Sequence, residues 1–343
     1  MSASPNLSVS RTSRAAKVAA VLGLLVLVIL ALAPWWAGRA NMRLMGEIFL
    51  YLALASLWNL MAGYAGLVSV GQQAYVGFGG YMLFALTIFG GLPPLVAIAG
   101  AAVLGAAISI PVALLIFRLR GAYFAIGTWV MAEVFRLSFA QISALGGGSG
   151  SSLPVDIVKS IANSRSMRES VSYWMALGSF IVVIAAVYLF LRSRRGLALT
   201  AIRDNELAAA SLGIDIWRTK FVVYVVTGGL TAMVGALIFL QKLRISPDAA
   251  FSVNDWTAFV IFIVVIGGIG TLEGPIIGTL VFFALRETLA DLGTIYLMVL
   301  GLVAIVIMLK APKGLWGLLR ARYDLQLFPL GYRVSGHTPD KET

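Results

Sequence analysis

Residue types that perform catalysis or hold metal ions are scarce in this sequence. Its 343 residues include no cysteine and one histidine, His337, in the polar C-terminal tail. A thiolate metal site, a cysteine nucleophile and a site built from several histidines are therefore excluded. The chain also lacks the motifs G-x-x-x-x-G-K-[ST] and H-E-x-x-H and any plausible Ser/His/Asp set. We therefore expect no catalytic residue, no metal site and no cofactor here, and the chain is not predicted to be an enzyme.

Polar side chains inside a glycine-rich apolar segment are the first candidates for a functional site. Asn59, Ser69, Gln72 and Gln73 carry polar groups that lipid could not satisfy. Glycine this dense permits close backbone approach or an interrupted helix. The hinge or close-packing candidates of this segment are Gly63, Gly66 and Gly71. The four polar residues are candidates to line a translocation pathway, and tight packing with polar groups bonding between helices is the alternative.

A second glycine-rich segment, residues 266–278, combines glycine and proline with a carboxylate, Glu273. Its hinge or close-packing candidates are Gly267, Gly268, Gly270, Gly274 and Pro275. Two interrupted segments, one in each half of the chain, are typical of an internal structural repeat around a transport pathway. A sharp turn between two helices is the alternative, and at Glu273 it is the favoured interpretation.

The segment 196–215 is too polar to cross a membrane and too rich in alanine for a simple linker. Asp204 or Asn205 can cap a helix, Glu206 suits its first turn, and Gly213 can end it. The pattern predicts a two-turn helix between two apolar runs. Such a helix, held at the membrane face, is suited to docking a partner protein. The alternative is an interfacial helix whose basic residues lie on lipid headgroups.

Charged residues within the apolar runs are few. Glu133 and Arg136 lie three residues apart on one face of a helix and can pair, which lowers the cost of burying either. An ion-coupled transporter more often shows isolated carboxylates in the middle of helices. Structural pairing is therefore favoured, although Glu133 is kept as a candidate for the pathway.

The composition shows which elements must position these residues. Hydrophobic residues make up 60% of the chain, charged residues 12%, and the mean hydropathy is +0.93. These values exclude a disordered protein, a nucleic-acid binder and an ordinary cytosolic enzyme. Apolar runs predict helices near 18–36, 44–62, 73–90, 94–117, 121–141, 171–191, 219–241, 256–272, 274–290 and 293–310. We expect an all-α, polytopic membrane bundle of about eight to ten transmembrane helices, with an uncleaved first helix favoured over a removed signal peptide.

The basic residues orient this bundle. With the N-terminus inside, 17 of the 26 Lys and Arg residues lie in cytoplasmic segments. This bias predicts an even number of spans and two cytoplasmic ends. We expect a cytoplasmic tail over 1–17, one transmembrane domain over 18–320 with its largest cytoplasmic loop at 192–218, and a second tail over 321–343.

Five blocks of this chain, in family order, resemble the permease subunits of branched-chain amino acid ABC importers of the LivM type. The blocks are LWNLMAGYAGLVSVGQQAYVGFGGY (57–81), LRGAYFAIGTWVMAEVFRL (119–137), GLALTAIRDNELAAASLGIDIWRTK (196–220), ISPDAAFSVNDWTAFVIFIVVIGGIGTLEGPIIG (245–278) and LKAPKGLWG (309–317). The resemblance implies an all-helical permease in the bacterial plasma (inner) membrane. Its implied partners are a homologous LivH-type permease, two ATP-binding subunits that use ATP, a periplasmic substrate-binding protein and membrane lipid, with no nucleic acid.

The resemblance also implies a role for the 196–215 segment, which is similar to the coupling helix of importer permeases. The E-A-A…G pattern of that helix is matched at Glu206, Ala208, Ala209 and Gly213. The residues expected to couple the chain to an ATPase are Arg203, Asp204, Glu206, Ala208, Ala209 and Gly213. Small alanines would let the helix enter a groove on the ATPase, and Gly213 would let the chain turn back.

The chain departs from many relatives at one position of the first block. Where they have Gly-His after the serine, it has Gly71 and Gln72, followed by Gln73. An uncharged amide replaces a titratable ring, so no proton-linked role is expected there. A urea or short-amide importer permease of the same family is one alternative function. An ion-coupled secondary transporter acting alone is the alternative from another class, and a membrane-embedded enzyme is disfavoured.

Overall fold

The ten predicted apolar runs form helices in the computed structural model. It describes residues 7–10, 14–162, 164–289, 295–311, 313–323, 328 and 333–336, so His337 and most of both predicted tails lie outside the described residues. The helices of the first half are α1 (Arg14–Ala31), α2 (Ala33–Trp36), α3 (Arg39–Asn59), η1 (Leu60–Tyr64), α4 (Gln72–Ile88), α5 (Pro94–Ile116), α6 (Ala122–Ala140), η2 (Ser143–Leu145), η3 (Gly147–Ser149) and α7 (Val155–Ile161). Those of the second half are α8 (Arg165–Arg192), α9 (Arg194–Asp204), α10 (Glu206–Ser211), α11 (Ile216–Lys242), α12 (Pro247–Ala250), η4 (Asn254–Ala258), α13 (Phe259–Gly267), α14 (Gly274–Thr288), α15 (Ile295–Lys310) and α16 (Gly314–Tyr323).

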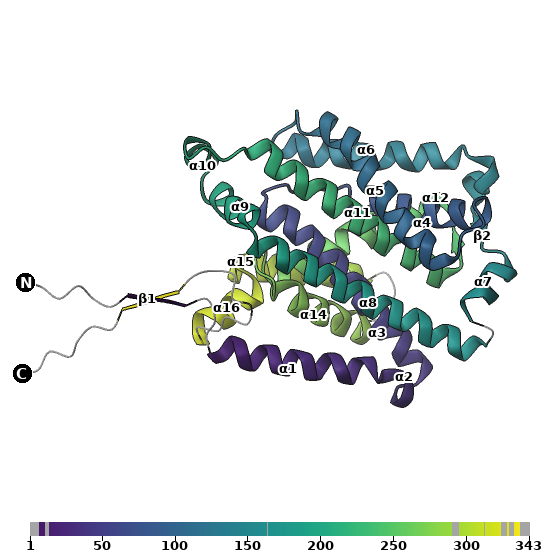
Figure 1. The fold of residues 1–343 in the computed structure, drawn as a ribbon, viewed down its shortest axis with the longest axis horizontal. Helices are drawn as coiled ribbons and strands as arrows, with labels where there is room; N and C mark the ends of the chain where they lie inside the picture. The colour runs from purple at the N-terminus through teal and green to yellow at the C-terminus, as the bar shows by residue number, and fades with distance from the viewer. Residues whose placement is uncertain are drawn as a thin grey trace, which may run out of the picture.

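The predicted fold class, an all-α polytopic membrane bundle, is confirmed. Within the described part of the chain, six helical stretches are long and apolar enough to cross a membrane: Arg39–Tyr64, Pro94–Ile116, Arg165–Arg192, Ile216–Lys242, Pro247–Gly267 and Leu297–Arg322. The runs outside this set are also helical, in α1, α4, α6 and α14. To reach the expected eight to ten spans, some of these four helices must also cross the membrane, although length and hydropathy alone do not identify them as spans. α9 and α10 lie at one end of the bundle, and α2, α7 and β2 (Ser151–Ser152) lie at the other (Figure 1).

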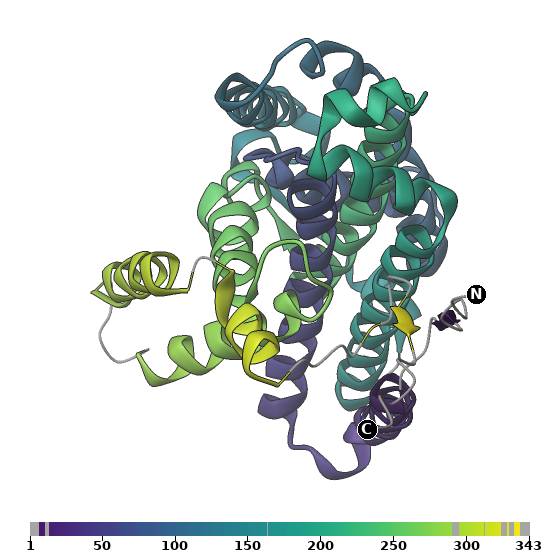
Figure 2. The ribbon, with the colours of Figure 1, turned by 90° about the vertical axis from the view of Figure 1, so that its left-hand side faces the viewer.

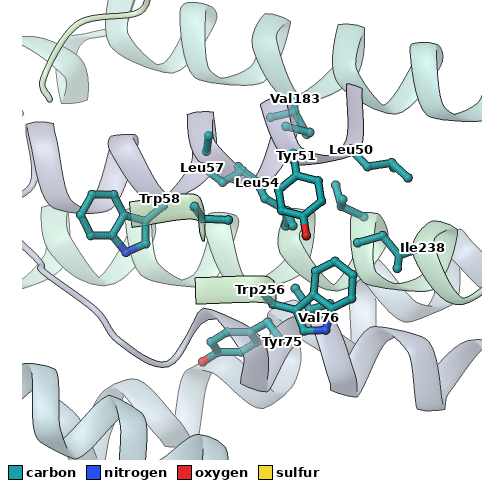
Figure 3. Close-up of a cluster of buried hydrophobic side chains, with 14 of the residues drawn as sticks. Leu50, Tyr51, Leu54, Leu57, Trp58, Tyr75, Val76, Val183, Ile238 and Trp256 are labelled. Atoms are coloured by element: carbon teal, nitrogen blue, oxygen red, sulfur yellow. The ribbon is translucent and has the colours of Figure 1, made fainter. Parts of the chain in front are cut away.

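Helix α3 occupies the middle of the bundle (Figure 2). In its spanning stretch, 78% of the most apolar window is buried inside the chain. Its neighbours include α8, α11, α13 and α14. Tyr51, Leu54 and Trp58 of α3 lie in a buried cluster with Val76 of α4 and Trp256 of η4 (Figure 3). Because α3 is surrounded by protein, its buried polar residues must find hydrogen-bond partners within the protein.

Helices α4 and α11 pack through glycines. A Cβ atom added to Gly79 would overlap the backbone of Ala232, and one added to Gly235 would overlap the backbone of Val76. Small residues at such crossings let two backbones approach closely, which is the usual way that helices associate in lipid. Part of the glycine excess is therefore used for packing.

Strands are short in the described residues. β2 pairs with β3 (Arg244–Ile245) at the end of the bundle that carries α7, with Ser151 opposite Ile245. β1 (Leu7–Ser10) pairs antiparallel with β4 (Arg333–Gly336). Neither pair contributes a layer to the bundle, in agreement with the all-α prediction.

Candidate functional site

The first glycine-rich segment interrupts the helical path between α3 and α4. The helix ends in the π-helical turn η1, and Gly66 adopts a left-handed conformation with φ +68°. The indole Nε1 of Trp58 donates to the carbonyl of Ser69 at 2.8 Å, and Ser69 Oγ accepts from the Gly71 amide at 3.1 Å. The predicted interruption is therefore present, and its backbone is held by side chains.

The second glycine-rich segment forms a sharp turn, residues 268–273, between α13 and α14. Gly268 and Gly270 have φ values of +131° and +76°, a region that favours glycine. Thr271 Oγ1 donates to the Gly268 carbonyl at 2.8 Å and accepts from the Gly274 amide at 3.1 Å. Pro275 lies at the start of α14, where its missing amide hydrogen costs nothing. The helix–helix turn that we favoured at Glu273 is confirmed.

The two interrupted segments contact each other through Asn59. Its Nδ2 donates to the Thr271 carbonyl at 2.7 Å, and its Oδ1 accepts from the Gly270 amide at 2.8 Å. Gly63 packs beside this contact, since a Cβ there would lie 2.5 Å from the Gly270 nitrogen. We call this contact, formed by Asn59, Gly63, Gly270 and Thr271, the glycine junction. It joins segments more than 200 residues apart in sequence at the end of the bundle that carries α9.

Arg203 of α9 reaches the glycine junction. Its guanidinium carbon lies 5.8 Å from the centroid of the Tyr64 ring, which is 4% exposed. Its Nη1 lies 3.5 Å from the position that a Cβ of Gly270 would occupy. Arg203 therefore lies against Tyr64 of the first interrupted segment and beside Gly270 of the second. The buried Glu273 lies beside the junction and accepts from the Phe328 amide at 3.1 Å through Oε1.

Helix α10 has the termini that the sequence predicts. Asn205 Oδ1 accepts from the Ala208 amide at 3.0 Å, as an N-cap does, and Gly213 turns the chain with φ +81°. Glu206 pairs with Lys220 of α11, which fixes α10 against the bundle.

The surface of α10 is mostly exposed, and α10 projects from its end of the bundle (Figure 1). Ala208 is exposed, whereas Ala209 is buried within the chain. Leu207 and Leu212 are 84% and 79% exposed. Our sequence analysis did not single out these two leucines, although two apolar residues within a polar loop were a readable signal.

The remaining pathway candidates of the first segment lie away from the glycine junction. Gln72 donates from Nε2 to the Leu54 carbonyl at 3.0 Å, and Gln73 Oε1 accepts from the hydroxyl of Thr257. Both glutamines are at most 2% exposed, and their remaining polar atoms, Gln72 Oε1 and Gln73 Nε2, have no hydrogen-bond partner in the described structure. They tie α4 to α3 and η4, and Thr257 was not singled out from the sequence.

Glu133 pairs with Arg136, as expected. The shortest contact, from Arg136 Nη2 to Glu133 Oε1, is 2.6 Å. Arg136 Nη1 also donates to Asp248 Oδ1 of α12 at 2.7 Å, a partner that the sequence did not indicate. This triad lies on α6 and α12, apart from the glycine junction. The structure thus brings Asn59, Gly63, Gly270 and Arg203 together and places Ser69, Gln72, Gln73 and Glu133 elsewhere.

Comparisons with known proteins agree with this architecture. The model of the family described as "Branched-chain amino acid transport system / permease component" matches residues 41–309. The chain is 26% identical to the high-affinity branched-chain amino acid transport system permease protein LivM of Salmonella typhimurium, over 89% of this chain and 77% of that protein. It is 25% identical to the LivM of Escherichia coli K12 over the same shares. A probable LivH permease of Methanocaldococcus jannaschii is 24% identical over 41% of this chain and 47% of its own.

No solved structure matches the chain. The family match covers both interrupted segments and the α9–α10 loop. The multi-pass helical bundle is what a transport permease requires, because a spanning backbone must satisfy its own hydrogen bonds. The chain therefore belongs to the branched-chain amino acid permease family and is a membrane-spanning permease subunit of an ABC importer.

Proposed function

We propose that this chain forms half of the translocation pathway of an ATP-driven importer of branched-chain amino acids. The observation that carries the proposal is the position of Arg203, against Tyr64 of the first interrupted segment and beside Gly270 of the second. Arg203 thus connects the loop that faces the ATPases to the glycine junction, where the interruption after α3 meets the turn between α13 and α14. Two relatives are LivM permease proteins of branched-chain amino acid transport systems, and they support branched-chain amino acids as the substrate class.

The proposed assembly contains four further subunits. A homologous LivH-type permease supplies the other half of the pathway, and the similarity to a probable LivH protein supports such pairing. Two ATP-binding subunits dock on α10, and a periplasmic substrate-binding protein delivers the amino acid. The chain itself carries no phosphate-binding loop in its sequence, so ATP is used by the partners and this chain needs no cofactor and performs no reaction of its own.

The orientation in the membrane follows from charge. We place the chain in the bacterial inner membrane with both ends in the cytoplasm, because 17 of its 26 basic residues then lie on the cytoplasmic side. In this orientation α9 and α10 face the cytoplasm, and α7 and the β2–β3 pair face outward. Exposed Leu207 and Leu212 then supply the apolar contacts for an ATPase groove.

Coupling requires that the ATPases bind α10 differently in their ATP-bound and ATP-free states. The pair of Glu206 and Lys220 links α10 to the start of α11. Asn205 joins α9 directly to α10, so the two short helices move together. A displacement of α10 reaches Arg203, and Arg203 transmits it to Tyr64 and Gly270. The glycine junction then changes the relative orientation of α3 and α13–α14, and with it the side to which the pathway opens.

The test is ATP-driven leucine uptake by the assembled transporter in proteoliposomes. Glu206→Arg and Ala208→Trp should lower uptake strongly while the chain still inserts and the two permeases still co-purify. Arg120→Ala, a change at an exposed basic residue in another loop, is the matched control and should leave uptake unchanged. Normal uptake in both α10 variants would refute the coupling assignment. Uptake by the chain alone, driven by an ion gradient, would instead establish a secondary transporter.

A further inference from the structure

A cavity of about 280 Å³ lies at the end of the bundle opposite α10. It is formed where the first residues of α3 and α8 meet the last residues of α11. Its polar lining includes Arg43, Arg165, Arg168, Glu169 and Gln241. None of these residues takes part in the glycine junction or in the α9–α10 loop, so the proposed coupling does not account for the cavity.

Positive charge is in excess at this cavity. Glu169 is the one carboxylate among the described residues of the lining, and it pairs with two arginines: Arg165 at 3.5 Å and Arg39 at 3.6 Å. Arg43 and Arg168 have no ion-pair partner among the described residues. The described lining therefore holds three arginines and one carboxylate, and Arg39 pairs with that carboxylate from outside the lining. Oε2 of Glu169 is buried and makes no hydrogen bond in the described structure, and its ion pair with Arg39 is long.

Aromatic residues place this cavity at the edge of the membrane. Trp174 of α8 packs against Trp35 with 5.8 Å between ring centroids and donates to the Ala31 carbonyl at 3.0 Å. Tyr173, which lines the cavity, donates to the Leu30 carbonyl of α1 at 2.7 Å. Exposed tryptophans at the end of apolar helices mark the interface where headgroups lie.

The cavity combines guanidinium groups with apolar walls. Met42, Ile161 and Leu240 lie beside the arginines in its lining. Arginine binds phosphate oxygens with two parallel hydrogen bonds, and phosphate groups of lipids lie at the depth of the tryptophan belt. Apolar walls suit the glycerol and upper acyl carbons that follow a lipid phosphate, whereas a free anion would gain nothing from them. We propose that this cavity binds the phosphate group of a phospholipid headgroup through Arg43 and Arg168.

Native mass spectrometry of the delipidated transporter, titrated with dioleoyl phosphatidylglycerol, tests the proposal. Arg43→Gln with Arg168→Gln should weaken binding of the lipid by about fivefold for each arginine removed. Arg43→Lys with Arg168→Lys keeps the charge and should retain part of the affinity, which separates binding from misfolding. Arg244→Gln, at an exposed arginine of β3 outside the cavity lining, is the matched control and should bind like the unmodified chain.

Two further titrations identify the source of the ligand. Inorganic phosphate and leucine are added separately to the lipid-loaded transporter at millimolar concentration. Retention of the lipid in both cases supports a phospholipid site. Displacement by phosphate alone would assign the cavity to a free anion, and displacement by leucine would assign it to substrate; either result overturns the lipid proposal. Equal weakening in the Arg244→Gln control would also overturn it. These readouts do not depend on ATP-driven uptake, so they stand apart from the proposed coupling.

Discussion

Replacing Asn59 with alanine should both destabilise the bundle and disconnect its two interrupted segments. The asparagine is 1% exposed and makes two hydrogen bonds that cross between segments, to the Thr271 carbonyl and from the Gly270 amide. In the Asn59→Ala variant, both backbone groups, which are partly buried, lose these partners. A fully buried group left without a partner costs about 1–3 kcal/mol and partial access to water lowers that cost, so the free energy of unfolding should fall by about 2–4 kcal/mol.

Reversible unfolding in mixed detergent micelles measures this loss, with Ser56→Ala as the matched control. Ser56 lies on the same helix, is 2% exposed, and donates to the Leu52 carbonyl at 2.7 Å. This hydrogen bond lies within α3, and in the Ser56→Ala variant the Leu52 carbonyl still accepts a backbone hydrogen bond of the helix. The control should therefore lose only about 1 kcal/mol.

Transport supplies the second measurement. ATP-driven leucine uptake should fall in the Asn59→Ala variant more than its stability loss explains, with ATP hydrolysis by the partner subunits retained. In the Ser56→Ala control, uptake should remain. If the Asn59→Ala variant unfolds like the control and transports normally, the glycine junction neither holds the bundle nor transmits motion.

Three further predictions concern the same region. Gly63→Ala should cost about 1–3 kcal/mol of stability through overpacking against Gly270, measured by the same unfolding assay. Gly23→Ala, where a Cβ meets nothing within 4 Å, should be neutral or slightly stabilising, because alanine suits a helix better than glycine; equal losses in the two variants would contradict the packing argument. Arg203→Ala should lower uptake without changing co-purification of the ATPases, and loss of co-purification would show that Arg203 serves docking instead. Asn205→Ala removes the cap of α10, should cost about 1 kcal/mol, and should raise amide hydrogen exchange in that helix only.

Much of the helical architecture is readable from local patterns. Ten apolar runs predict ten helical regions, and each contains a helix among its described residues. The cap at Asn205 and the turn at Gly213 follow from residue type, because capping and positive φ depend on a few neighbouring residues. The pair of Glu133 and Arg136 follows from a spacing of three on one helix.

The partners of the buried polar residues follow from tertiary structure. Asn59 reaches Gly270 and Thr271, Gln73 meets Thr257, and Arg136 has a second partner beyond Glu133. Composition and periodicity specify which face of a helix is apolar, but they carry no information on where two helices cross. The identity of each partner is therefore undetermined until the helices are placed.

The sequence by itself determined a membrane-spanning helical bundle, because hydrophobicity acts over one helix. The resemblance of five blocks indicated the permease family, and capping residues predicted a short helix in the loop that we propose as the docking site. The tertiary structure decided that the two glycine-rich segments meet, that Arg203 lies beside both, and that arginines from α3 and α8 line one cavity. These arrangements depend on contacts between residues far apart in the chain, and such contacts exist only when the bundle has packed.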